Sequence, residues 1–225
     1  MDQNQVDHAR TTDPSGLAPD AQAPRTTRED WLRLALEYLV DDGIDRVKIQ
    51  IIASRLGVSR SGFYWFFKSS QDLHDQMLEY WLHRNTGPII ERAMRPCATI
   101  SLGILAVFEC WVDGTLFDSR LDIAVRLWGR RSKKVSAIVA HADHQRLEAL
   151  SHMFLRHGYA EEDAKIRARV LYFTQIGHFT LDFPEDMKTR ISHVPTYIHA
   201  FCGRDATHEE FEMFKAFARK HHAEV

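Results

Sequence analysis

Residues 46–71 read RVKIQIIASRLGVSRSGFYWFFKSSQ, and the spacing of their apolar side chains predicts two short helices, over 49–56 and 60–67. Gly57 lies between the two helices, where the chain must turn and where glycine adopts a positive φ without steric cost. Ser59 follows as the expected side-chain cap of the second helix. The pattern is that of a helix-turn-helix, in which the second helix can enter the major groove of DNA.

The charge of this stretch supports the same interpretation. No Asp or Glu occurs between Asp45 and Asp72, although a share proportional to the 31 acidic residues of the 225-residue chain predicts roughly three or four there. Five basic residues do occur, and they are Arg46, Lys48, Arg55, Arg60 and Lys68. A positive surface without carboxylates suits binding to phosphates. The alternative is a helical hairpin whose basic face is merely solvated.

The composition of the whole chain sets wider limits. With 225 residues the chain can bury a large core as one domain or two, and 29 Lys and Arg against 31 Asp and Glu leave it nearly neutral. Three cysteines without metal-ligand spacing fit a reduced setting. No apolar run approaches the ~18 residues of a membrane span, and the N-terminus lacks the basic-then-apolar order of a signal peptide. We therefore expect a cytoplasmic protein with no membrane partner.

Helical periodicity extends over the rest of the chain, so the expected fold class is all-α. A first helix from about Thr27 to Asp42 precedes the two-helix motif, and another helix starting near Ser70 follows it. Gly87 and Pro88 are expected to kink or break that helix, because proline has no N–H to donate. Further helices are expected over 99–117, 119–130, 133–157, 161–183, 186–202 and 207–222, with Pro195 as a break in the fifth of these.

These helices group into two expected domains behind a tail. Residues 1–24 are polar and cannot offset their ordering entropy by burial, so we expect them to be disordered. Residues 25–84 are expected to form the helix-turn-helix DNA-binding domain, including the helix that starts near Ser70. Residues 85–225 are expected to form a C-terminal helical bundle for ligand binding and dimerisation.

Residues 27–81 resemble the N-terminal domain of the tetracycline-repressor (TetR) family. The residues that carry the resemblance are Ile52-Ala53, Gly57-Val58-Ser59, Phe63-Tyr64, Phe67 and Leu73, preceded by Trp31, Ala35 and Gly43. The rest of the chain agrees with that family in length, class and helix order. The resemblance implies a homodimeric transcriptional regulator, usually a repressor, that leaves its DNA operator when a small-molecule effector binds the C-terminal domain.

The resemblance also implies which side chains contact DNA. The expected DNA-binding residues are Lys48, Ser59, Arg60, Ser61, Tyr64, Trp65 and Lys68. Two of the positions depart from the family, with Lys48 in place of the common Thr and Ser70 in place of the usual Lys. We expect the phosphate contacts to be redistributed accordingly.

Three of these side chains have plainer alternatives. Arg60 can donate two hydrogen bonds to guanine, or it can contact a phosphate without any sequence preference. Tyr64 follows Phe63 at the edge of the buried face, so it can donate its hydroxyl to a phosphate, or it can be a core aromatic with its hydroxyl in water. Trp65 can be a single exposed aromatic, which requires no function.

Aromatic and acidic side chains gather in the C-terminal half, where a pocket between helices would be mostly apolar with a few polar groups. The expected effector pocket comprises Phe108, Glu109, Trp111, Asp113, Phe117 and Trp128 on one side, and Tyr172, Phe173 and His178 on the other. If Glu109 or Asp113 faces this pocket, a cationic or hydroxylated ligand is expected, because a buried carboxylate must be paired. The alternative for the aromatics is an ordinary bundle core.

Dimerisation is expected through residues 144–157 and 161–183, which would pack against their copies as a four-helix bundle across a two-fold axis. Such a dimer would present two recognition helices about one turn of DNA apart, ~34–36 Å, to a palindromic operator. Effector binding would then change the angle of the helix that starts near Ser70, and with it this separation.

No other chemistry is indicated. The chain lacks a nucleophile elbow, a phosphate loop and a dinucleotide-binding glycine pattern, so we expect neither an enzyme nor a cofactor. His141 and His144 share a helix face, but no third ligand is near them in sequence, so no metal site is expected. The competing hypothesis is a helical adaptor that uses the two-helix motif for protein contacts. A steep loss of duplex affinity with salt would distinguish a DNA-binding protein from such an adaptor.

Overall fold

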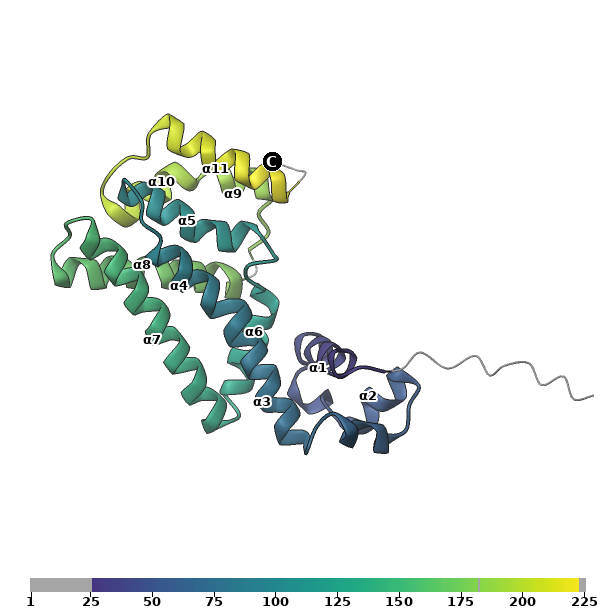
Figure 1. The fold of residues 1–225 in the computed structure, drawn as a ribbon. Coiled ribbons are helices and arrows are strands. Elements are labelled where there is room, and N and C mark those ends of the chain that lie inside the picture. Colours follow the sequence, from purple (N-terminus) through teal and green to yellow (C-terminus); the bar gives the residue numbers. More distant parts are fainter. Residues whose placement is uncertain (1–25, 182, 223–225) are drawn as a thin grey trace, which may run out of the picture.

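The computed structural model describes residues 26–181 and 183–222, and every regular element in these ranges is helical (Figure 1). The tail expected over residues 1–24 lies outside the described residues. The first elements are α1 (Arg28–Asp42), η1 (Ile44–Arg46), α2 (Ile49–Leu56), η2 (Arg60–Trp65), α3 (Ser70–Trp81), η3 (Leu82–Thr86) and α4 (Gly87–Met94). The later elements are α5 (Ile100–Val112), α6 (Ser119–Gly129), α7 (Lys133–Arg156), α8 (Glu161–Leu181), α9 (Met187–Ser192), α10 (Val194–Cys202) and α11 (His208–His221). The all-α class is confirmed.

Helix α1 begins with the cap that the sequence predicts. The hydroxyl of Thr27 accepts a hydrogen bond from the N–H of Asp30 at 3.2 Å, and the Asp30 carboxylate accepts one from the N–H of Thr27 at 2.9 Å. One residue further on, Trp31 is fully buried and meets the ring of Phe63 edge-on, with the centroids 5.3 Å apart. This contact holds α1 against the second half of the helix-turn-helix motif.

The second helix of the motif differs from the expected one. Arg60–Trp65 forms a 3-10 helix, η2, instead of an α-helix over 60–67. Gly62 and the aromatic run that follows it have low α-helix propensity. Ser59 gives no side-chain cap, because its hydroxyl lies 2.7 Å from the hydroxyl of Ser61. In a 3-10 helix the side chains at i and i+3 line up, so Ser61 and Tyr64 lie on one line along η2.

A helical path leads from the N-terminal domain into the rest of the chain. Ser69 caps α3, not Ser70, and its hydroxyl accepts a backbone N–H of the first turn at 3.2 Å. The break expected at Gly87 and Pro88 does not occur, because the helix widens into the π-helix η3, in which the N–H of Gly87 donates to the C=O of Leu82. Pro88 then lies in the first turn of α4, where its missing N–H is not needed.

The core of the N-terminal domain extends beyond its own segment of the chain. Helix α6 packs on α1 and α3, and its Leu121, Val125 and Trp128 belong to the same buried cluster as the α1 and α3 side chains. Two exposed ion pairs lie nearby: Arg120 of α6 pairs with Asp41 of α1 at 2.7 Å, and Lys134 of α7 pairs with Asp75 of α3 at 2.6 Å. Figure 1 shows α6 between the N-terminal domain and the upper helices.

A second core lies at the other end of the molecule, among α4, α5, α7, α8, α10 and α11. The break expected at Pro195 falls at His193, between α9 and α10. Pro195 lies in the first turn of α10, where proline is tolerated. Within the described ranges, the helices are too short or too polar to cross a membrane.

Candidate nucleic-acid interface and ligand cavity

The turn of the helix-turn-helix motif is built on Gly57, which adopts a left-handed φ of +69°. In this conformation the N–H of Val58 donates to the C=O of Ala53 at 3.0 Å and closes α2. On the inner side of the motif, Phe63 is fully buried and stacks on Phe67 with the ring centroids 5.1 Å apart. The turn and the aromatic stack together fix which side chains of η2 face outward.

All seven expected DNA-binding side chains are exposed in this arrangement. Tyr64 is 58% exposed and Trp65 is 86% exposed, which excludes both from the protein core. Tyr64 touches the core only through the edge of Phe63, at a centroid distance of 5.3 Å. The interpretation of Tyr64 as a core aromatic is therefore wrong, and its hydroxyl is available to a ligand.

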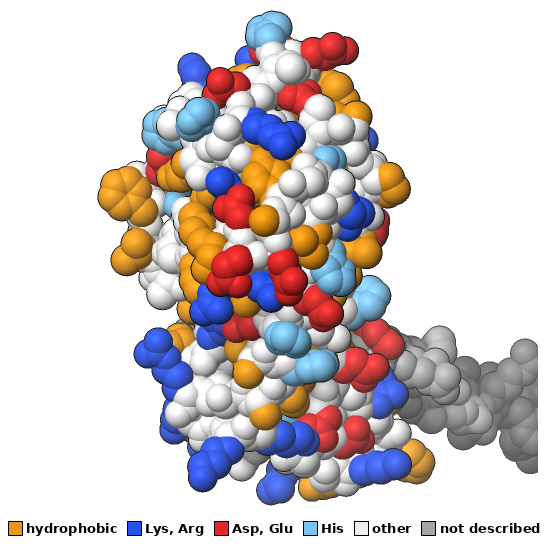
Figure 2. Space-filling view, turned by 90° about the vertical axis from the view of Figure 1, so that its left-hand side faces the viewer, with side chains coloured by type: hydrophobic (Ala, Val, Ile, Leu, Met, Phe, Trp, Pro, Cys, Tyr) orange, Lys and Arg blue, Asp and Glu red, His pale blue; other side chains and the backbone are white. Residues whose placement is uncertain are grey.

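The basic side chains of the motif are exposed as well, and they are Arg46, Lys48, Arg55, Arg60 and Lys68. The described ion pairs of the N-terminal domain use Arg33 of α1, and Arg120, Arg131 and Lys134 from later in the chain, instead of these five cations. Figure 2 shows Lys and Arg side chains along the lower end of the molecule, where this domain lies. The carboxylate of Asp72 accepts the backbone N–H of Lys68 at 2.8 Å, and this bond lowers the pKa of Asp72. The first acid after the motif thus remains charged but faces the start of α3.

Comparison with known proteins agrees with this geometry. Residues 32–77, which contain the whole two-helix motif, match the family model described as bacterial regulatory proteins, tetR family. The N-terminal domain belongs to the tetR family. The expected family is confirmed, and with it the assignment of α2 and η2 as a helix-turn-helix of that family.

Two curated relatives share this tetR domain. The chain is 40% identical to the tetracycline repressor protein class C of Escherichia coli over 58 residues, which are 26% of either chain. It is 27% identical to the HTH-type transcriptional repressor KstR2 of Mycolicibacterium smegmatis over 97 residues, 41% of this chain and 47% of that protein. The matches therefore span about a quarter and about half of the lengths of these relatives.

Two solved structures resemble this chain over most of its length. A transcriptional regulator from Rhodococcus sp. Rha1 superposes with a TM-score of 0.57 at 16% identity, covering 85% of this chain and 97% of its own. GusR of Salmonella enterica superposes with a TM-score of 0.55 at 16% identity, covering 88% and 98%. At such low identity the likeness concerns the fold, which includes the C-terminal helices.

A cavity of about 50 Å³ opens among α5, α8, α9, α10 and α11. Three of the nine expected pocket residues line it, namely Phe108, Trp111 and His178. The pKa of His178 is lowered by its partial burial and by the nearby Arg190, so its imidazole is neutral at neutral pH. This volume is below the ~300–1,000 Å³ usual for small-molecule sites, so a ligand of that size would have to widen the cavity.

The two acidic residues expected in the pocket lie elsewhere. Glu109 pairs with Arg92 at 3.1 Å and with Arg95 at 3.3 Å. Asp113 lies 3.1 Å from the imidazole of His221. Both carboxylates already have partners outside the cavity, so neither supports the expectation of a cationic ligand.

The other four expected pocket residues are also elsewhere. Phe117 stacks on Phe179 at a centroid distance of 5.6 Å, and Phe173 is 50% exposed on the outer face of α8. Trp128 belongs to the N-terminal core, as described for α6. Tyr172 lies on α8 in a separate buried cluster of polar groups. Helical periodicity shows which face of its helix an aromatic side chain lies on, but it does not show which other helix that face contacts.

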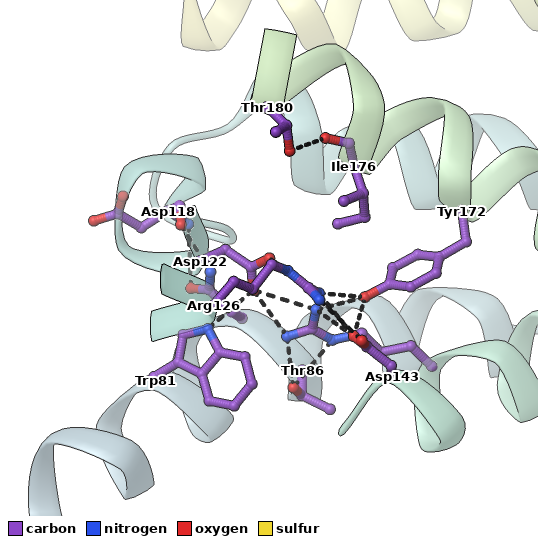
Figure 3. Close-up of polar contacts among 11 residues, drawn as sticks. Trp81, Thr86, Asp118, Asp122, Arg126, Asp143, Tyr172, Ile176 and Thr180 are labelled. Atoms are coloured by element: carbon purple, nitrogen blue, oxygen red, sulfur yellow. Dashed lines mark hydrogen bonds and ion pairs between the residues drawn. The ribbon is translucent and has the colours of Figure 1, made fainter. Parts of the chain in front are cut away.

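That buried cluster joins α3, η3, α6, α7 and α8 (Figure 3). The hydroxyl of Tyr172 donates to Asp143 at 2.6 Å and accepts from Arg126 at 2.9 Å and from Arg146 at 2.8 Å. The guanidinium of Arg146 is fully buried and also donates to Asp122 at 3.2 Å.

Further contacts of the cluster reach the path from α3 to α4. Asp122 accepts from the indole N–H of Trp81 at 2.9 Å, and Arg146 donates to the hydroxyl of Thr86 at 2.9 Å. Burial alone would raise the pKa of Asp122, but Arg146 and Arg126 more than offset it and hold that pKa below its usual range. Asp122 is therefore a buried carboxylate that stays charged and is hydrogen-bonded on several sides.

The cavity also contains residues that sequence reasoning missed. Arg190 and Tyr197 come from α9 and α10, and Gln175 comes from α8. Residues 186–202 were expected only to be helical, and residues 161–183 were expected to form the dimer interface and to contribute Tyr172, Phe173 and His178 to the pocket.

Proposed function

We propose that this protein is a homodimeric transcriptional regulator, a repressor in its usual mode, that binds a palindromic operator and leaves it when a small molecule enters the C-terminal cavity. The observation that carries the DNA-binding part is the exposed, carboxylate-free turn of residues 46–71, with five exposed cations. Operators of this kind are read in the cytoplasm, where this protein would act. The adaptor alternative does not account for five cations without a nearby acid.

In the proposed complex, η2 lies in the major groove. Arg60 and Ser61 at its start approach base edges, since the N-terminal residues of a recognition helix contact bases. Tyr64, in line with Ser61, donates its hydroxyl to a phosphate, and the indole of Trp65 lies against the backbone. Around η2, the remaining contacts to phosphates or sugars come from Lys48, Ser59 and Lys68.

The proposed dimer interface lies on α7 and α8, within residues 144–157 and 161–183. Three large apolar side chains on α8 are exposed at helical spacing, namely Ile166 at 51%, Val170 at 45% and Phe173 at 50%. Leu155 of α7 is 37% exposed. A row of apolar side chains left in water on two adjacent long helices is typical of an interface, and a two-fold copy would bury it.

Helix α8 provides the proposed link between effector and DNA. Leu171, Gln175 and His178 face the cavity, whereas Tyr172 on the same helix bonds to Arg126 and Arg146. A ligand that shifts α8 would therefore alter the buried cluster and, through α6 and η3, the orientation of α3. The ligand changes operator affinity only if it binds one of these arrangements better than the other.

Selection of bound duplexes from a random pool tests the proposal. We expect two inverted half-sites with centres about 10–10.5 bp apart, or a multiple of that spacing. Arg60→Ala should weaken binding to the selected duplex ~5- to 100-fold, and Arg219→Ala, an exposed cation of α11, should not. The affinity should fall steeply with salt.

Three results would contradict the proposal. The first is a pool that stays unenriched after selection, and the second is duplex binding that does not depend on salt, which would favour the adaptor. The third is a monomeric mass at micromolar concentration in sedimentation, which would remove the dimer.

A further inference from the structure

The wall of the C-terminal cavity is largely apolar. Phe108 lies at its centre, 5.1 Å from the ring of Trp111 and 6.2 Å from the rings of Phe201 and Phe214. Leu171, Ile191 and Val194 complete this wall. Such a surface accommodates a hydrocarbon or aromatic body and offers it no hydrogen bonds.

The polar side of the cavity contains Arg190, a partly buried cation. Among the described residues, no carboxylate lies within ion-pairing distance of its guanidinium, and no side-chain hydrogen bond is formed by it. One face of the guanidinium covers the ring of Phe179 at 5.4 Å, which leaves the N–H groups at its edge available. Glu185 also lines the cavity and interacts electrostatically with Arg190, but its carboxylate lies 3.1 Å from Nδ1 of His193.

Other polar groups of the cavity add donors. The side-chain Nε2 of Gln175 is buried and has no hydrogen-bond partner within the described residues. Burial lowers the pKa of Arg190, although the nearby Glu185 opposes this effect. The guanidinium still keeps its charge at neutral pH, because arginine is not deprotonated in proteins. Buried donors without acceptors cost free energy, and an incoming acceptor with a negative charge would remove that cost.

We propose that the cavity binds a monocarboxylate with an apolar aromatic or aliphatic body, whose carboxylate pairs with Arg190 and Gln175 while the body packs on Phe108 and Trp111. A guanidinium can donate two parallel hydrogen bonds to a carboxylate, which orients the ligand as well as binding it. The inference rests on the proposed function in one respect, that this cavity is the effector site. The proposed ligand is an anion, whereas Glu109 and Asp113 led us to expect a cationic or hydroxylated ligand.

Matched probes test this chemistry on the full chain. Benzoate, 4-phenylbutanoate and decanoate are compared with the corresponding primary amides and amines by thermal shift and by calorimetry. At least one carboxylate should raise the melting temperature and bind ~10- to 100-fold more tightly than its amide, the usual value of a charge-assisted bond. Equal binding of acid and amide, tighter binding of an amine, or no binding by any member of the panel would overturn the inference.

Two variants separate the role of Arg190 from a general loss of structure. Arg190→Met should remove the advantage of the acid over the amide without lowering the melting temperature of the free protein, because the cation that it removes forms no ion pair with a carboxylate of the described residues. Arg219→Met, on the exposed face of α11, should leave the advantage unchanged. A marked fall in the melting temperature of Arg190→Met would show that its charge has a structural partner and would overturn the argument.

Operator binding is measured separately, so the two proposals fail in different ways. Carboxylate binding that leaves duplex affinity unchanged supports the ligand class and contradicts the effector role. A duplex that is released by an amine from the panel and not by a carboxylate supports the regulator and overturns the ligand class.

Discussion

Replacing Arg146 by Met tests how the buried cluster holds the two halves of the molecule together. The Arg146 side chain is fully buried and donates to Asp122 at 3.2 Å, to Thr86 at 2.9 Å and to Tyr172 at 2.8 Å. Removing one member of a buried ion pair costs ~3–5 kcal/mol, mostly because the remaining charge stays buried. Asp122 retains Arg126 at 2.7 Å, so we expect the lower end of that range, ~3 kcal/mol.

Chemical and thermal unfolding, followed by circular dichroism, measure this loss. A change of ~3 kcal/mol should lower the melting temperature by ~6–12 °C in a chain of this size. The double variant Arg146→Met with Asp122→Leu should recover part of the loss, because it no longer leaves a charge unpaired. Arg219→Met is the exposed control and should stay within ~0.5 kcal/mol of the parent. If the stability of Arg146→Met also stays within ~0.5 kcal/mol of the parent, the argument about the buried ion pair is refuted.

Three further predictions concern single positions. Gly57→Ala should cost ~1–2 kcal/mol in urea unfolding, because the φ of +69° is strained for a residue with a Cβ, whereas Gly62→Ala in η2 should be neutral or stabilising by up to ~1 kcal/mol. Arg146 and Arg126 hold the pKa of Asp122 low against the effect of burial. The charge of Asp122 therefore stabilises the fold above about pH 4, and this contribution is lost as the pH falls through the folded-state pKa. The loss of stability caused by Asp122→Asn should become smaller in thermal melts taken from about pH 7 to about pH 3. Burial raises the pKa of Cys110 to about 12, so at about pH 8 iodoacetamide should label Cys97 and spare Cys110 until the protein unfolds, as peptide mass spectrometry would show.

The parts of the fold that the sequence predicts well depend on local chemistry. The cap at Thr27, the turn at Gly57 and the helical class each follow from a residue and its near neighbours in sequence. The geometry of η2 and η3 is determined less completely by the neighbouring residues in the sequence. In η2, Gly62 weakens the α-helix and leaves a 3-10 helix, and before Pro88 the chain widens into a π-helix instead of breaking. A proline marks the position of such a change but does not determine which form it takes.

The candidate sites also differ in how far their residues lie apart in the sequence. The DNA-binding side chains lie within about 20 residues of one another, between Lys48 and Lys68, so a short motif is enough to place them. The cavity depends on contacts between distant segments, such as Phe108 with Phe214, and so does the buried cluster, in which Arg146 and Thr86 are separated by 60 positions. No spacing rule pairs such residues, which explains why Arg190 was missed and why Trp128 was expected in the effector pocket.

The placement of α6 limits how this protein can be recombined with others of its fold. Leu121, Val125 and Trp128 come from the half of the chain that holds the cavity, yet they fill the core beneath α1 and α3. A chimera joined after Met94 would supply a foreign α6 and leave that surface poorly matched. Exchanging DNA specificity between such proteins would therefore require transplanting residues 119–129 together with the N-terminal domain, although more than twenty positions separate the two segments.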